Sequence, residues 1–175
     1  MVLGMSLSTF TAVHVLISLV GILTGVVVAY GLLYGKRLDG MTAVFLATTV
    51  LTSATGYLFP FHQITPGMIV GAISLAVLAI AVVARYVRRM ERSWRATYVI
   101  TALLALYLNV FVLVVQSFEK VPSLRELAPT QKEPPFKVVQ LVLLAIFVTL
   151  SFFAVRRFRN PVEVAVTEWT AKKAS

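Results

Sequence analysis

The 175-residue chain contains no cysteine, and charged residues make up only 13% of it. The absence of cysteine excludes disulfides, thiolate metal sites and thiol redox chemistry. A soluble domain has about 25% charged and about 45–50% apolar residues, whereas 59% of this chain is apolar. Such a chain has too little polar surface to cover itself in water, so we expect the excess apolar area to face lipid.

Acidic residues are also scarce, with seven Asp and Glu against sixteen Lys and Arg, for a net charge of +9. A strongly basic chain can bind nucleic acid, but here the basic residues lie in short clusters between apolar runs. Clusters in such positions set membrane topology and contact anionic lipid head groups. The charge pattern therefore favours a membrane protein over a nucleic-acid binder.

Five runs are long and apolar enough to cross a bilayer as helices, and the only Asp, Glu, Lys or Arg within them is Lys137, the second residue of the last run. A spanning helix needs about 20 mostly apolar residues. The runs are 10–34, 41–59, 67–84, 96–118 and 136–155. We therefore expect an all-α membrane protein, with a five-helix transmembrane bundle in residues 1–160 and a cytoplasmic tail at 161–175. We do not expect the first run to be a cleaved signal peptide, because residues 1–9 lack Lys and Arg.

The positions of Lys and Arg predict the orientation of the bundle. The first and third connections and the C-terminal tail hold twelve of them: Lys36, Arg37, Arg85, Arg88, Arg89, Arg92, Arg95, Arg156, Arg157, Arg159, Lys172 and Lys173. The opposite side holds four: Lys120, Arg125, Lys132 and Lys137. Because basic loops remain in the cytoplasm, we expect the N-terminus outside and the C-terminus in the cytoplasm.

Small and polar residues at helical spacing predict how the helices meet. One face of the first span carries His14, Ser18, Gly21 and Gly25, and one face of the fourth carries Ala102, Ala105, Asn109, Val112 and Gln116. We expect both faces to look into the bundle. The pairs Gly31/Gly35 and Gly67/Gly71 also have the spacing that lets helix backbones approach closely.

The connection 119–135 is the longest in the chain. Residues 122–128 are predicted to form a short interfacial helix, with Pro122 at the first helical position. Residues 130–135 are predicted to be extended, because Pro134 and Pro135 disfavour helix before them.

The uncommon polar residues of the bundle fall in its predicted outer half. They are His14, Asn109, Gln116, Lys120 and Gln140. Burying polar groups in lipid is costly, so such groups often mark a functional site. We predict that these five residues bind a ligand in one polar pocket, with Lys120 and residues 130–135 as its lid. The alternative for His14, Asn109 and Gln116 is interhelical hydrogen bonding.

Sequence signatures of catalysis are absent. The chain has no Ser-His-Asp set, paired carboxylates or P-loop spacing. Its two histidines, His14 and His62, lie in a span and in a loop, which disfavours bis-histidine haem ligation. We therefore expect no catalytic residue, no metal site and no enzymatic activity, and the sequence leaves any cofactor unknown.

Four segments carry a resemblance to a known group. They are Leu-Tyr-Leu-Asn-Val-Phe-Val-Leu-Val-Val-Gln at 106–116, Lys-Val-Pro at 120–122, Ala-Pro-Thr-Gln-Lys-Glu-Pro-Pro-Phe at 128–136 and Gly-Lys-Arg-Leu-Asp-Gly at 35–40. Over nearly its whole length the chain resembles an uncharacterised group of small polytopic bacterial inner-membrane proteins. The resemblance implies a bacterial cell inner membrane, and it carries no function and no site residue.

The preferred function is that of a non-enzymatic integral membrane protein. It is expected to bind a lipid-soluble molecule, a quinone or another lipid, in the outer-half pocket, or to serve as an accessory subunit. A small transporter or channel is the alternative, although ion-coupled pumps and proton relays generally need a charged residue deep within a span and the only one in the five runs is Lys137, at the start of the last. A membrane redox protein is less favoured. Membrane lipids are the expected partners, together with a protein partner or further copies of the chain.

Overall fold

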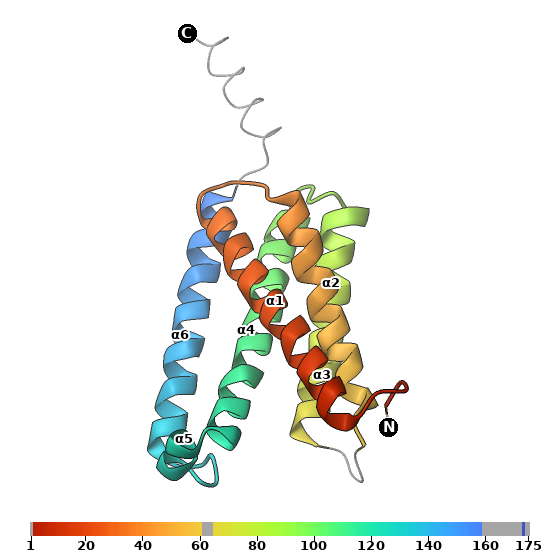
Figure 1. Ribbon diagram of the computed structural model, residues 1–175. Helices are drawn as coiled ribbons and strands as arrows, with labels where there is room; N and C mark the ends of the chain where they lie inside the picture. The colour runs from red at the N-terminus through yellow and green to blue at the C-terminus, as the bar shows by residue number, and fades with distance from the viewer. Residues whose placement is uncertain (1, 61–64, 159–172, 174–175) are drawn as a thin grey trace.

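The computed structural model describes residues 2–60, 65–158 and 173 (Figure 1). The helices are α1 Leu7–Leu33, α2 Asp39–Thr55, α3 Pro66–Val82, α4 Trp94–Lys120, α5 Pro122–Leu127 and α6 Pro134–Arg157, with a 3-10 turn η1 at Gly56–Leu58 and a π-helical turn η2 at Val83–Val87. Within these residues, five helices are long and apolar enough to cross a membrane, which confirms the all-α prediction. His62 and, apart from Lys173, the predicted tail at 161–175 lie outside the described residues.

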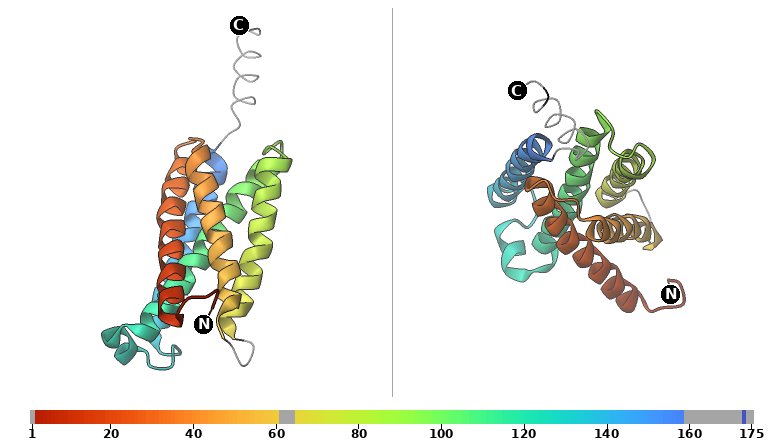
Figure 2. Two further views of the ribbon diagram at one scale, coloured as in Figure 1. Left: turned by 45° about the vertical axis from the view of Figure 1, so that its right-hand side comes forward. Right: turned by 90° about the horizontal axis from the view of Figure 1, so that it is seen from above.

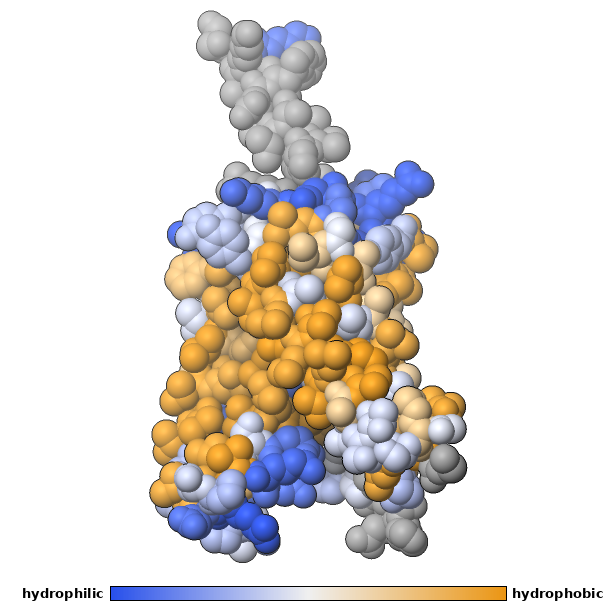
Figure 3. Space-filling view, in the orientation of Figure 1, coloured by the Kyte–Doolittle hydropathy of each residue, from blue (hydrophilic) through white to orange (hydrophobic). Residues whose placement is uncertain are grey.

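The helices alternate in direction, so the connections gather at two opposite ends (Figures 1 and 2). One end carries the α1–α2 and α3–α4 connections and the end of α6. We call it the basic end, because it holds Lys36, Arg37, Arg85, Arg88, Arg89, Arg92, Arg95, Arg156 and Arg157. The other, the α5 end, carries the start of α1 and the short helix α5. A broad apolar band separates the polar ends in Figure 3.

Local sequence explains where several helices begin. The Ser6 side chain accepts a hydrogen bond from the Thr9 N–H at 3.1 Å and caps α1. Thr65 caps α3 in the same way through the Met68 N–H. The short helix predicted after Pro122 is confirmed as α5. The prediction of an extended segment at 130–135 is wrong for most of its length. Gln131 closes a turn by donating its N–H to the Ala128 carbonyl, and Pro134 and Pro135 occupy the first turn of α6, where a proline's missing N–H costs nothing.

Gly35 ends α1, and a Cβ there would lie 3.5 Å from the Arg157 carbonyl oxygen of α6, so in the Gly31/Gly35 pair it is Gly35 that meets another helix. Its φ is +67°, and the N–H groups of Gly35 and Lys36 donate to the carbonyls of Leu32 and Gly31. This left-handed Schellman cap satisfies carbonyls that the helix end leaves free. Gly31 is approached by the Leu38 side chain of the following connection.

The predicted small face of α1 is confirmed as a helix interface. A Cβ on Gly21 would lie 3.1 Å from Thr48 Oγ1 and 3.3 Å from Asn109 Nδ2. A Cβ on Gly25 would lie 2.6 Å from Leu106 Cδ1 and 2.9 Å from the Phe45 ring. The two glycines therefore allow α1 to approach both α2 and α4. In the Gly67/Gly71 pair only Gly71 meets another element, the Tyr57 ring at 3.3 Å.

The tightest packing lies in the half of the bundle next to the basic end. The core there includes Val28, Leu32, Phe45, Leu46, Leu78, Ala81, Tyr98, Val99, Leu106, Ala154 and Phe158. Toward the α5 end, α1 leaves α4 and crosses toward α2 and η1 (Figure 1). The inward face predicted for α4 is therefore buried at Ala102, Ala105 and Asn109 but exposed at Gln116, because none of the described helices covers its last turns on that side.

Candidate functional site

His14 forms an interhelical contact between α1 and α2. Its Nδ1 atom lies 2.9 Å from Thr55 Oγ1, and its Cε1 atom lies 3.9 Å from the Cβ position of Gly56. The Phe59 ring meets the imidazole edge-on, with centroids 5.2 Å apart. The structure thus gives His14 the interhelical hydrogen-bonding role, at the α5-end half of the bundle.

Asn109 connects α4 to α1. Its Oδ1 accepts a hydrogen bond from the Ser18 hydroxyl at 2.9 Å. The side chain is buried, and among the described residues its Nδ2 has no hydrogen-bond partner. The nearby Thr48 and Thr49 hydroxyls donate to the carbonyls of their own helix, as the threonine-rich sequence of α2 suggests.

Gln140 and Gln116 lie on other contacts. Gln140 is half-buried and its Nε2 donates to the Phe111 carbonyl at 3.5 Å, which links α6 to α4. Gln116 is exposed. His14, Asn109 and Gln140 are thus bound to three different partners, on α2, α1 and α4. One pocket shared by all five predicted residues stays a prediction.

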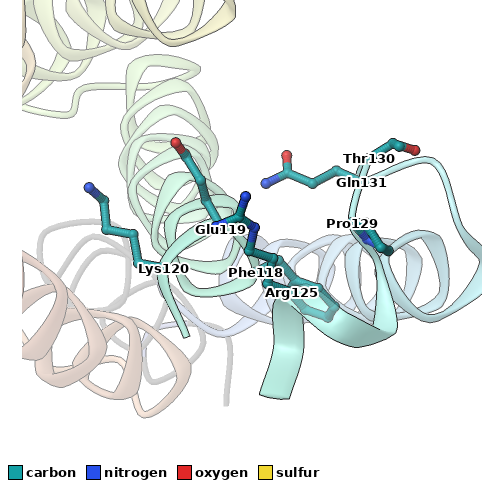
Figure 4. Close-up of a pocket in the computed structure, with 7 residues that line it drawn as sticks. All are labelled: Phe118, Glu119, Lys120, Arg125, Pro129, Thr130 and Gln131. Atoms are coloured by element: carbon teal, nitrogen blue, oxygen red, sulfur yellow. The ribbon is translucent and has the colours of Figure 1, made fainter. Parts of the chain in front are cut away.

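Lys120, the fifth predicted residue, lines a pocket at the α5 end that we call the α5 pocket. It has a volume of about 530 Å³ and is lined by Phe118, Glu119, Lys120, Arg125, Pro129, Thr130 and Gln131 (Figure 4). The end of α4, α5 and the loop after α5 supply these residues. In Figure 4 the Arg125 and Gln131 side chains point toward one another, whereas Glu119 and Lys120 extend away from them.

The α5 pocket has an excess of positive charge. It contains two cations, Lys120 and Arg125, and one carboxylate, Glu119. Among the described residues, neither cation forms an ion pair within 4.0 Å. Arg and Lys present five and three N–H donors and no acceptor. The pocket is therefore suited to an anionic or carbonyl group that accepts hydrogen bonds.

Two contacts fix the loop that walls the α5 pocket. Gln131, whose φ is +58°, donates from Nε2 to the Val115 carbonyl of α4 at 3.0 Å. Glu133 accepts hydrogen bonds from the Thr130 hydroxyl at 2.8 Å and from the Lys132 N–H at 2.9 Å. Sequence reasoning did not single out Gln131 or Glu133. The spacing Thr-x-x-Glu, which is typical of a local capping contact, was the available signal for Glu133.

Acidification is expected to loosen this loop. The Thr130 hydroxyl and the backbone N–H groups of the loop lower the pKa of the Glu133 carboxyl from its usual value of 4.5. A lowered pKa means that the contact stabilises the loop above pH 4.5 and is lost as the pH falls through the folded-state pKa. NMR in detergent micelles should show the Thr130 amide shift titrating below pH 4.5.

The variant Glu133→Gln should remove this titration, whereas Glu126→Gln, on α5, should retain it. A Thr130 amide that titrates at or above pH 4.5 in the parent protein would contradict the assignment of the contact to ionised Glu133.

Arg85 is a buried charge that sequence reasoning assigned to topology. It lies in η2, its side chain is 5% exposed, and it forms a salt bridge with Asp39 at the start of α2. Its guanidinium carbon lies 4.9 Å from the centre of the buried Tyr98 ring, and Nη1 lies 4.0 Å from Met90 Sδ. The arrangement joins α2, the α3–η2 segment and α4 at the basic end. Because π-helical turns recur at functional sites, Arg85 is a further candidate functional residue, separate from the five predicted ones.

Within the part of the chain that the structure describes, no three His, Cys, Asp or Glu side chains come together as a metal site requires. No model of a protein family, no curated protein and no solved structure matches the chain. Its function therefore has to be argued from the geometry of its own residues.

Proposed function

We propose that this protein binds a lipid-soluble, amphiphilic molecule, a quinone or a lipid, whose anionic or carbonyl head group enters the α5 pocket. The observation that carries the proposal is a pocket of about 530 Å³ lined by two cations, Lys120 and Arg125, that form no ion pair with any described residue. Sites for small ligands have volumes of about 300–1,000 Å³. Charge-assisted hydrogen bonds from Arg and Lys are about twice as strong as neutral ones.

The position of the α5 pocket suits a ligand that arrives through the bilayer. Phe118, one of its lining residues, packs edge-on against Phe136 of α6, with ring centroids 5.3 Å apart. Exposed apolar side chains continue along α6 from Val138 to Leu141. A ligand can therefore keep its apolar part in the lipid beside α6 while its head group reaches Lys120 and Arg125.

We further propose that the α5 end faces outward and that the basic end faces the cytoplasm of a bacterial cell. The support is the gathering of Lys and Arg at the basic end, as positive-inside topology requires. The resemblance to bacterial inner-membrane proteins supports the choice of membrane. In this orientation the ligand comes from the outer leaflet.

The proposal is one of binding rather than catalysis. The α5 pocket offers one hydroxyl, on Thr130, which donates to Glu133, outside the pocket lining. Nucleophilic catalysis needs a base strong enough to accept the proton of such a hydroxyl, and the Glu133 carboxylate is a weak base because its pKa is lowered from the usual 4.5. A binding protein of this kind can act alone or as an accessory subunit that holds the ligand for a partner.

The double variant Lys120→Gln/Arg125→Gln is expected to lose at least about nine-tenths of any co-purifying quinone or lipid. Hydrogen bonds to charged groups contribute about 1.5–3 kcal/mol each, and about 1.4 kcal/mol corresponds to a tenfold change in affinity. Mass spectrometry of protein extracted in mild detergent measures the bound molecule directly.

Lys137→Gln is the matched control, because Lys137 lies at the same end, in the first turn of α6, and does not line the pocket. If the double variant and the control retain equal amounts of the bound molecule, the α5 pocket is not its binding site.

A further inference from the structure

A second hollow lies on the outside of the bundle, between α4 and α6, and we call it the α4–α6 groove. It has a volume of about 530 Å³ and is lined by residues between 100 and 107 of α4 and between 144 and 156 of α6. Apart from Ser151 and Arg156 the lining is apolar, and it includes the aromatic side chains of Tyr107, Phe147 and Phe152. This groove lies toward the basic end, away from the α5 pocket.

A single cation lies where the groove meets the basic end. The Arg156 guanidinium carbon lies 4.0 Å from the centre of the Phe152 ring, and among the described residues Arg156 forms no ion pair. The neighbouring Arg95 is already engaged, because it donates to the carbonyls of Val155 and Phe158 and so caps the end of α6. Arg156 is thus the cation of the groove that remains available to an anion.

We propose that the α4–α6 groove binds one acyl chain of an anionic phospholipid, with the lipid phosphate on Arg156. From Leu144 to Arg156 the helix rises about 18 Å, at 1.5 Å per residue. One leaflet of a bilayer contributes about half of the 30 Å hydrocarbon thickness. The groove therefore has the length of one leaflet, and its cation lies at the depth of the head groups.

The lining disfavours a transmembrane helix as the occupant. Close packing of helices in lipid depends on small residues that let the backbones approach. Ser151 is the one small residue of the lining, and large side chains such as Leu104, Tyr107 and Phe147 surround it. A flexible chain of methylene groups fits between such side chains, whereas a rigid helix is held away by them.

The test compares phosphatidylglycerol with phosphatidylcholine of the same acyl chains, added to the delipidated full-length protein and counted by native mass spectrometry. We expect the parent protein to prefer phosphatidylglycerol. One Lys or Arg near the head groups accounts for about a fivefold preference for anionic lipid. Arg156→Gln should remove that preference, and Arg157→Gln, one residue away and outside the lining, should retain it.

A second pair of variants tests the acyl chain. Ser151→Trp fills the groove and should reduce binding of both lipids by about tenfold, as expected when about 1.4 kcal/mol of chain contacts is lost. Val142→Trp is the control, because Val142 is exposed on α6 outside the lining. Thermal unfolding in detergent identifies a variant that fails to fold, and Leu144→Trp then replaces Ser151→Trp.

Three results would overturn the inference. The parent protein could bind both lipids equally, Arg157→Gln could have the same effect as Arg156→Gln, or both groove-filling variants could leave lipid binding unchanged.

Because the chain has no cysteine, Ser151→Cys adds a direct check. A disulfide-linked dimer formed in membranes would show that a second copy, and not a lipid, occupies the groove. None of these results depends on the α5 pocket.

Discussion

Replacing Asp39 with Asn is expected to lower the free energy of unfolding by about 2–3 kcal/mol, whereas Arg85→Met should cost about 1 kcal/mol or less. The asymmetry follows from exposure, because the Arg85 side chain is 5% exposed and the Asp39 side chain is 75% exposed. Without Asp39, the guanidinium stays buried beside Tyr98 and Met90 without a counter-charge. Without Arg85, the carboxylate returns to water, and a methionine fills the buried space.

Thermal or denaturant unfolding in a mild detergent measures both variants. The double variant Asp39→Asn/Arg85→Met should be no less stable than Arg85→Met, apart from the few tenths of a kcal/mol that an acid contributes in the first turn of a helix. Equal costs for the two single variants would mean that Arg85 is solvated in the native protein and that the salt bridge does not join the helices.

Replacing Gly25 with Ala is expected to destabilise the bundle by about 1–3 kcal/mol, the usual range for overpacking a core. The new Cβ would lie 2.6 Å from Leu106 Cδ1 and 2.9 Å from the Phe45 ring. Both neighbours are almost fully buried and cannot move aside freely. The steric cost exceeds the gain of up to about 1 kcal/mol that Ala gives over Gly in a helix.

Gly40→Ala is the matched control, since Gly40 lies in α2 and no described atom comes within 4 Å of its Cβ position. It should leave the midpoint of thermal unfolding unchanged or raise it slightly. If Gly25→Ala is as stable as Gly40→Ala, α1 does not pack against α2 and α4 at Gly25.

The five spanning helices could be predicted because each apolar run is long and has no charged residue away from its ends, so the bilayer requirement alone identifies it. By the same requirement the third span was predicted to end at Ala84, before the charged Arg85. The helix in fact continues through η2, and Arg85 is buried, because Asp39 and Tyr98 provide the charge and the aromatic face that a buried guanidinium needs. These partners lie far away in the sequence, where no local pattern indicates them.

The candidate site was predictable to a similar extent. Helical spacing correctly placed Gly21, Gly25 and Asn109 on inward faces. It failed at Gln116, because periodicity identifies a face of α4 but not the point at which α1 leaves it. Lys120 was singled out from its depth alone. The wall of its pocket depends on the left-handed backbone of Gln131. Residues other than glycine adopt this conformation only uncommonly, so it could not be predicted from the sequence.

The central claim is that the basic end and the α5 end lie on opposite sides of a membrane, with the α5 pocket outside. Because the chain lacks cysteine, two matched variants can test it, Ser93→Cys in the α3–α4 connection and Ser123→Cys in α5, both at exposed serines. A membrane-impermeant maleimide should label Ser123→Cys in intact cells and Ser93→Cys only after the membrane is permeabilised. Labelling of both variants in intact cells, or of neither, would contradict the five-span bundle, and the reverse pattern would place the α5 pocket in the cytoplasm.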